Sequence, residues 1–167
     1  YPESSKWYLA IDKSTSVWVQ GLLEHGWAQL LAGDNQGAVG NMFSLQSTYI
    51  KSVYKPESYV IRTIGYLNLC QYPDAYKSLS LLEIEYRPWL AKMYRYARGH
   101  SKSSDYYSTV VRHLSNPKTL EIDGLPFQVV REMGRHKDFL NLQESINNRI
   151  DESDQYNFIR GFAKKDS

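Results

Sequence analysis

The chain repeats one order of residue types at a spacing of 37 residues, and this repeat restricts its fold more than any other feature. Each copy passes from a short corner to an alanine, then through an apolar helical pattern to a Tyr-x-Pro ending. The first copy comprises Gly33-Asp34, Ala38 and Tyr54-Lys55-Pro56, and the second comprises Cys70-Gln71, Ala75 and Tyr86-Arg87-Pro88. Because one helical hairpin cannot bury its apolar face alone, a repeat of this length predicts stacked hairpins.

These positions resemble the tetratricopeptide repeat (TPR), a helix-turn-helix unit of about 34 residues. The matching positions are Gly26, Gly33 and Ala38 in the first copy and Tyr59, Tyr66, Tyr72 and Ala75 in the second. The departures are Leu22 and Gln29 in place of aromatics, Thr63 in place of a small residue, and Cys70 in place of the turn glycine. The resemblance covers roughly residues 17–90. It implies an all-α fold, an α-solenoid of TPR-like antiparallel helical hairpins.

Two regions follow from this pattern, with TPR-like hairpins over 1–100 and a divergent helical extension over 101–167. Apolar periodicity and proline or glycine breaks predict the individual helices. The expected helices are 4–12, 17–32, 38–53, 57–70, 73–86, 89–97, 105–114, 126–133, 139–150 and a looser one over 156–162. Residues 118–124 show little periodicity and are predicted to form a linker, and no strand is expected.

The composition excludes several classes of protein. A net charge of +2 is too small to favour nucleic acid or an anionic membrane as the main ligand. Cys70 is the one cysteine, so a disulfide within the chain is impossible. No run of 18 apolar residues occurs, so we expect no membrane span in this chain. Most of the 14 tyrosines are expected to pack between helices.

No arrangement of residues points to catalysis, and we expect neither an enzyme nor a bound cofactor or metal. The four histidines lack the spacing of metal ligands and are interpreted as surface or helix-end residues: His25, His100, His113 and His136. Cys70 is interpreted as a small buried hydrophobe, away from the helix N-termini that activate thiols. Glu24 has no second acid near it in sequence and is interpreted as a solvated helix residue.

One cluster, Arg87, Tyr94 and Arg98, has chemistry suited to binding. Spacings of seven and four place the three side chains on one helical face. The favoured interpretation is an ordinary helix with solvated arginines. The alternatives are an acidic protein partner and, less favoured by the small net charge, a nucleic acid.

In the TPR family the first helix of each hairpin lines the binding groove, so the resemblance implies a partner-binding face. Carried over by position, that face contains Gln20, Trp27, Glu57, Ile64, Arg87, Tyr94 and Arg98. The expected function is therefore a non-catalytic scaffold or adaptor that binds a protein or peptide, with acidic residues on the partner as one option. The alternative is a helical domain that positions substrate or a partner for a larger cell-wall enzyme. Self-association through the C-terminal helix is a third option.

A second resemblance concerns the cellular setting. The opening Tyr1-Pro2-Glu3-Ser4-Ser5 resembles the end of a repeat in bacterial envelope-assembly proteins, so we expect a part of a longer protein. The run from Trp27 to Tyr72 is similar to periplasmic repeat proteins of predatory and gliding bacteria. These likenesses favour the periplasm over the cytoplasm.

Overall fold

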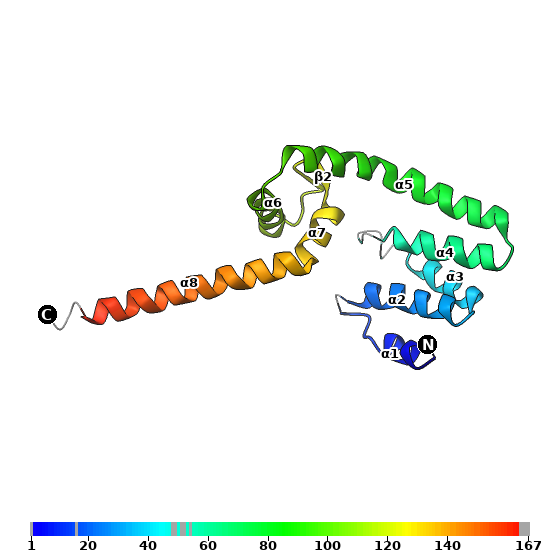
Figure 1. The fold of residues 1–167 in the computed structure, drawn as a ribbon, viewed down its shortest axis with the longest axis horizontal. Helices are drawn as coiled ribbons and strands as arrows, with labels where there is room; N and C mark the ends of the chain where they lie inside the picture. The colour runs from blue at the N-terminus through cyan, green and yellow to red at the C-terminus, as the bar shows by residue number, and fades with distance from the viewer. Residues whose placement is uncertain (1, 16, 48–49, 51–52, 54, 164–167) are drawn as a thin grey trace. The chain divides into compact units, whose positions relative to one another are not determined.

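The protein is described by a computed structural model that covers residues 2–15, 17–47, 50, 53 and 55–163. Contacts divide the chain into two compact units, Tyr1–Arg95 and Tyr96–Ser167. The described residues of both units are mainly helical, which confirms the expected all-α class (Figure 1). The helices are α1 (Pro2–Leu9), α2 (Trp18–Leu31), α3 (Asn35–Ser44), α4 (Glu57–Asn68), α5 (Tyr72–Gly99), α6 (Ser103–Ser115), α7 (Phe127–Arg135) and α8 (Lys137–Ala163), and the strands are β1 (Glu121–Ile122) and β2 (Leu125–Pro126).

In the first unit, α2, α3 and α4 pack against one another around an apolar core. The core residues are Leu23, Ala38, Met42, Leu45, Ile50 and Ile61. Two glycines allow the helices to approach closely. A Cβ atom on Gly26 would lie 2.6 Å from the Met42 side chain, and one on Gly65 would lie 2.6 Å from that of Val39. The close contact of α3 with both α2 and α4 therefore depends on the missing side chains.

The two predicted corners adopt the same geometry. Gly33 and Cys70 both have positive φ angles, of 81° and 58°. In each corner the next amide donates to a carbonyl five residues back, at 2.9 Å in both cases. This left-handed residue after the helix satisfies carbonyls that the helix end would leave unpaired. Cys70 therefore adopts the left-handed conformation of a turn glycine. The interpretation of Cys70 as a buried residue is wrong, because Cys70 is exposed.

Ala38 and Ala75 are the fourth residues of α3 and α5 and are both buried, with 0% and 3% of their surface exposed. This confirms that the repeated alanines pack between helices. Each alanine amide donates to a carbonyl four residues back, at 3.0 Å in both cases. A small side chain at this point lets the helix that follows the corner lie close to its neighbours.

Helix α3 ends earlier than predicted. Its last residue is Ser44, whereas the predicted helix extended to residue 53. The buried Lys55 side chain contacts the segment that follows this end. Its ammonium donates hydrogen bonds to the carbonyl of Leu45, the C-cap residue of α3, and, at 3.0 Å, to that of Ile50. These bonds pair carbonyls of the segment after the helix, which would otherwise need other partners. Tyr49 and Tyr54, which the predicted pattern included, lie outside the described residues.

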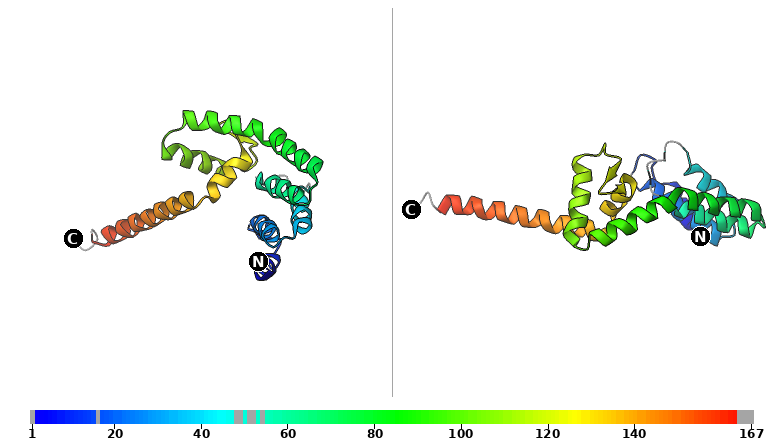
Figure 2. Two further views of the ribbon diagram at one scale, coloured as in Figure 1. Left: turned by 45° about the vertical axis from the view of Figure 1, so that its right-hand side comes forward. Right: turned by 90° about the horizontal axis from the view of Figure 1, so that it is seen from above.

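The predicted helix break at Pro88 is wrong, because α5 runs unbroken from Tyr72 to Gly99 (Figure 2). A proline in a helix removes one hydrogen bond, here to the carbonyl of Ile84. Both residues lie on the exposed side of α5, where water can satisfy that carbonyl. The rings of Tyr86 and Trp89 pack edge to face at 5.1 Å across the proline. The helices predicted over 73–86 and 89–97 are therefore one helix.

The second unit contains a two-stranded hairpin where a linker without strands was predicted. Ile122 pairs with Leu125, and the turn residues Asp123 and Gly124 have φ angles of 51° and 79°. Two successive left-handed residues match the right-handed twist of a hairpin, and Asp-Gly is a strong signal for such a turn. Ile122 and Leu125 are buried with Val110, Val129 and Val130 in the core of this unit.

Helix α8 is one continuous helix over 137–163, whereas two helices were predicted. Near its start the Phe139 ring stacks on Tyr107 with centroids 5.7 Å apart, and the Tyr107 hydroxyl donates to Gln143 at 3.1 Å. These contacts fix the first turns of α8 on α6. From 147 to 160 every residue is exposed.

Candidate functional site

Two of the predicted binding residues contact each other directly. The indole N–H of Trp27, on α2, donates a hydrogen bond to the carboxylate of Glu57, on α4. Gln20 lies two turns earlier on α2 and donates to Glu24 at 2.8 Å. Ile64 lies on α4 and is half-buried. The structure thus places these four predicted residues on two helices that pack against each other.

Apolar side chains extend the surface around this bond. Leu31 follows Trp27 on α2, and Val60 and Leu67 flank Ile64 on α4, all three at least 40% exposed. The spacings of three and four residues put each set on one side of its helix. The surface, called the α2–α4 face here, consists of Gln20, Glu24, Trp27, Leu31, Glu57, Val60, Ile64 and Leu67.

The charges of the α2–α4 face are acidic. Glu24 and Glu57 are exposed, whereas the basic side chains of these two helices, His25 and Arg62, are buried. The sequence analysis placed His25 at the surface, which is wrong. Burial lowers the pKa of His25, and the Asn41 amide lies 3.1 Å from its Nδ1 atom. A neutral imidazole that accepts this hydrogen bond fits both observations.

Arg87, Tyr94 and Arg98 lie on another element, α5. Arg87 pairs with Glu83 one turn away at 3.0 Å, and both side chains are largely exposed. Tyr94 is exposed as well. Arg98 is exposed in the last turn of α5 and belongs to the second unit. The predicted binding residues therefore fall into two groups on different helices.

A buried polar cluster beside α4 was missed by the sequence analysis. The Tyr59 hydroxyl donates to Glu85 at 2.5 Å, and burial followed by this hydrogen bond raises the pKa of Tyr59 to about 12. Burial also lowers the pKa of the Lys55 ammonium, an effect that Glu85 partly offsets. Ser58 donates to the Lys55 carbonyl at 2.8 Å. The cluster joins the chain before α4 to α5 and is structural.

Arg62 is buried with only part of its guanidinium satisfied. Its Nε and Nη1 atoms have no hydrogen-bond partner in the part of the chain that is described. The guanidinium carbon instead lies 4.1 Å from the centroid of the Phe43 ring and 5.6 Å from that of Tyr59. Attraction between the cation and the two rings offsets part of the cost of burial. Arg62 occupies an apolar position of the helical pattern, so periodicity gave no sign of its packing.

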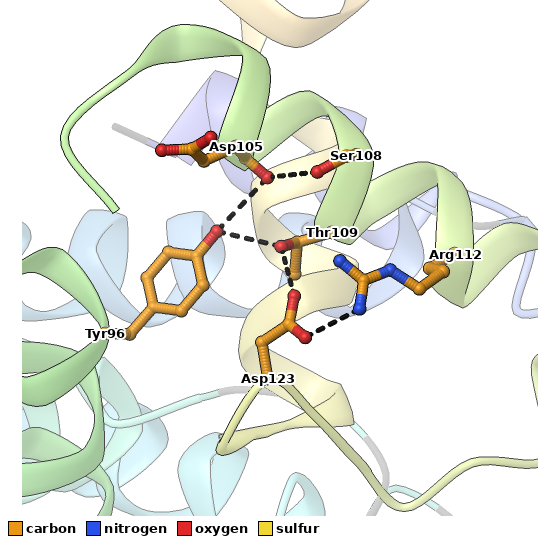
Figure 3. Close-up of polar contacts among 6 residues, drawn as sticks. All are labelled: Tyr96, Asp105, Ser108, Thr109, Arg112 and Asp123. Carbon is orange, nitrogen blue, oxygen red and sulfur yellow. Dashed lines mark hydrogen bonds and ion pairs between the residues drawn. The ribbon is translucent and has the colours of Figure 1, made fainter. Parts of the chain in front are cut away.

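The second unit holds a chain of polar contacts between α5, α6 and the hairpin turn (Figure 3). The Tyr96 hydroxyl donates to Thr109 Oγ1 at 2.9 Å, and that hydroxyl donates to Asp123 at 2.6 Å. The other carboxylate oxygen of Asp123 accepts from Arg112 at 2.7 Å. Burial raises the pKa of Tyr96. Since each of these polar groups is paired with another, the arrangement braces the hairpin turn against α5 and α6.

His113 lies in the last turn of α6, which confirms the helix-end alternative of its prediction, whereas a surface position would be wrong. It is buried, and its Nδ1 atom has no hydrogen-bond partner within the described ranges. Its ring lies 6.3 Å from that of Phe127. Helical periodicity alone could have placed it, because Thr109, Val110 and His113 share one side of α6.

Among the described residues, no three side chains of His, Cys, Asp or Glu gather in a way that could hold a metal ion. Within the same ranges, each helix is too short or too polar to span a bilayer. Comparison with family models, with curated proteins and with solved structures gives no match to this chain.

Proposed function

We propose that the first unit is a non-catalytic protein-interaction module whose α2–α4 face binds a segment of a partner protein. The observation that carries this proposal is the row of exposed apolar side chains beside the Trp27–Glu57 bond. Contiguous exposed apolar groups with a polar rim are typical of binding surfaces. Tryptophan is also among the residues that most often contribute binding energy in interfaces.

The proposed architecture is a pair of TPR-like hairpins, α2 with α3 and α4 with α5. Its support is the equivalence of the corners at Gly33 and Cys70, in φ angle and in hydrogen bonds. The burial of Ala38 and Ala75 at equivalent positions adds to it. In this arrangement α2 and α4 are the first helices of their hairpins, which in TPR proteins line the binding side.

The charges of the face favour a particular kind of partner segment. Glu24 and Glu57 suit an apolar segment that carries lysine or arginine. The acidic partner suggested by the sequence depended on Arg87 and Arg98, which lie on α5. We therefore propose a basic or neutral segment for the α2–α4 face.

A selection from a random peptide library tests this proposal. The bait is the purified chain, and the variant is Val60→Asp/Leu67→Asp, which places charge on the face. We expect selected peptides that are apolar and basic, with affinity roughly tenfold weaker for the variant, about 1.4 kcal/mol. Leu120→Asp is the matched control, because Leu120 is 77% exposed in the other unit.

Circular dichroism of each variant separates loss of binding from loss of fold. Peptides that bind the double variant as well as the unmodified chain would contradict the proposed face. Selection of acidic peptides would contradict the proposed partner chemistry. No enrichment of any peptide would contradict the function itself.

A further inference from the structure

One side of α5 exposes a stripe of large side chains within the first unit. Tyr76 and Tyr94 are 74% and 63% exposed, and Leu79 and Leu90 are 52% and 49% exposed. The exposed ion pair Glu83–Arg87 lies between them. The α5 stripe is defined by these six residues: Tyr76, Leu79, Glu83, Arg87, Leu90 and Tyr94. Spacings of three and four keep them on one side of the helix.

The other side of α5 is already used by the fold. Ala75, Ser78 and Tyr86 are buried, with 3%, 0% and 8% of their surface exposed. The hydroxyl of Ser78 donates to the Tyr59 carbonyl on α4 at 3.3 Å. The stripe is thus the side of α5 that does not pack on α4. It is an unusually large apolar surface for a helix in water.

The stripe has nearly the same order of residue types from its middle toward either end of α5. The one difference is that the two central residues have opposite charges. Outward from residue 85 come Glu83 and Arg87, then Leu79 and Leu90, then Tyr76 and Tyr94. A helix rises about 1.5 Å per residue, so the members of each pair lie at nearly equal distances from the midpoint. With a two-fold axis through the middle of the stripe, this order lets residues of the same type, or of opposite charge, face each other.

We propose that the α5 stripe is a homodimer interface on which a second copy of this chain packs its own α5 in antiparallel orientation. Each Glu83 then lies opposite Arg87 of the second copy, and each Tyr76 lies opposite a Tyr94. A parallel arrangement would place Glu83 against Glu83 and Arg87 against Arg87. Charge complementarity therefore favours the antiparallel direction, and the near-symmetric order of the stripe favours a second copy as the occupant.

The size of the stripe indicates a reversible dimer. A tyrosine side chain buries about 150–250 Å² when fully covered, and the stripe offers two partly exposed tyrosines and two leucines per copy. The total for two copies is on the order of 1,000 Å², at the low end of specific interfaces. We expect dissociation in the micromolar range.

Charge exchange tests the proposal. Sedimentation of the unmodified chain at about 5 to 500 μM should show a monomer–dimer equilibrium. Glu83→Arg and Arg87→Glu should each weaken dimerisation about tenfold or more, because each sets like charges opposite one another. An equimolar mixture of the two variants should recover the dimer, since every facing pair in the heterodimer is again opposite in charge.

Lys77→Glu is the matched control, because Lys77 is exposed on α5 but lies off the stripe. It should leave the dissociation constant unchanged. All four proteins should show the same helical content by circular dichroism, because the changed residues are exposed. A chain that stays monomeric to 500 μM, or variants that dimerise as the unmodified chain does, would overturn the proposal.

Cysteine pairing tests the direction. In a Cys70→Ser background, Leu79→Cys and Leu90→Cys are mixed and oxidised. Antiparallel packing predicts a disulfide between position 79 of one copy and position 90 of the other. Predominant 79–79 and 90–90 products would refute the antiparallel arrangement.

Discussion

The side chains of Trp27 and Glu57 are hydrogen-bonded to each other, indole N–H to carboxylate, and so join α2 to α4. Both residues had been predicted to bind a partner, but their mutual contact had not been predicted. The bond fixes the direction of the indole ring on the α2–α4 face. It also ties one charge of that face to its largest apolar side chain.

Glu57→Ala should lower the stability of the first unit, because it leaves the half-buried Trp27 N–H without its carboxylate partner. Hydrogen bonds to charged groups contribute about 1.5–3 kcal/mol when buried, and we expect about 1 kcal/mol at this exposed site. Urea denaturation followed by tryptophan fluorescence measures the change. Glu24→Ala is the control and should change stability by less than about 0.5 kcal/mol. Equal effects from the two substitutions would show that the bond contributes nothing.

Ala75→Leu should destabilise the first unit by about 1–3 kcal/mol, since a larger side chain overpacks a residue that is 3% exposed. The melting temperature, measured by circular dichroism, should fall clearly. Ala91→Leu adds the same atoms at an exposed position of the same helix and should be nearly neutral. A variant at position 75 as stable as the unmodified chain would contradict the close packing of the repeated alanine.

Stability should fall as the pH drops from about 7 to 5.5, in part through His25. Burial lowers the pKa of His25 in the folded state, with an opposing effect from Asp34. The unfolded chain, with an ordinary histidine pKa of about 6.5, therefore takes up the proton more readily, and acid favours unfolding. Protonation would also remove the acceptor for Asn41.

His25→Gln should flatten this part of the pH dependence, measured as the melting temperature at several pH values. His136→Gln is the control, because the His136 side chain is 68% exposed, and it should keep the slope of the unmodified chain. A slope that is unchanged by His25→Gln would contradict the assignment.

Cys70→Gly should stabilise the first unit slightly. A residue other than glycine at a φ angle of 58° is strained by about 1–2 kcal/mol, of which the greater freedom of glycine in the unfolded chain offsets about 0.5–1 kcal/mol. Cys70→Val should destabilise, because a branched side chain fits the left-handed region poorly. Thermal denaturation of the three proteins gives the order, and a loss of stability in the glycine variant would refute it. The exposed thiol should also react with a thiol reagent in the folded protein.

The sequence predicted the parts of the fold that depend on local chemistry and on the repeat. The corner at Gly33 and the alanines at 38 and 75 follow from the preferences of helix ends and from the need for small residues between helices. Cys70 shows the limit of residue type as a guide. The packing of the helices on either side sets the corner geometry, so Cys70 adopts a positive φ angle although it is not glycine.

The misses have separate physical causes. Pro88 is a helix breaker by type, but one lost hydrogen bond on a solvated side costs less than the packing of a long helix gains. Lys55 binds the carbonyls of Leu45 and Ile50 in the segment after α3, and periodicity does not capture a contact of this kind. The dipeptide Asp123-Gly124 is typical of a hairpin turn, but strands of two residues are too short to show an alternating pattern.

The candidate site was predictable only in part, because sequence position assigns a residue to a helix but not to a contact. The sequence placed Trp27 and Glu57 on helices predicted over 17–32 and 57–70, which the structure has as α2 and α4. The pairing between them, and the assignment of Arg87 and Tyr94 to a separate stripe, depend on which faces the helices bury. Arg62 illustrates the same point, because nothing in its sequence neighbourhood marks a guanidinium packed on Phe43.

The final half of α8 has a thermodynamic consequence. From 147 to 160 every residue is exposed, so burial of side chains contributes little to the stability of this stretch. Isolated helices of this length are marginal in water. On heating, this stretch therefore loses its helix gradually, before the packed units unfold cooperatively, and a slope in the ellipticity precedes the main transition.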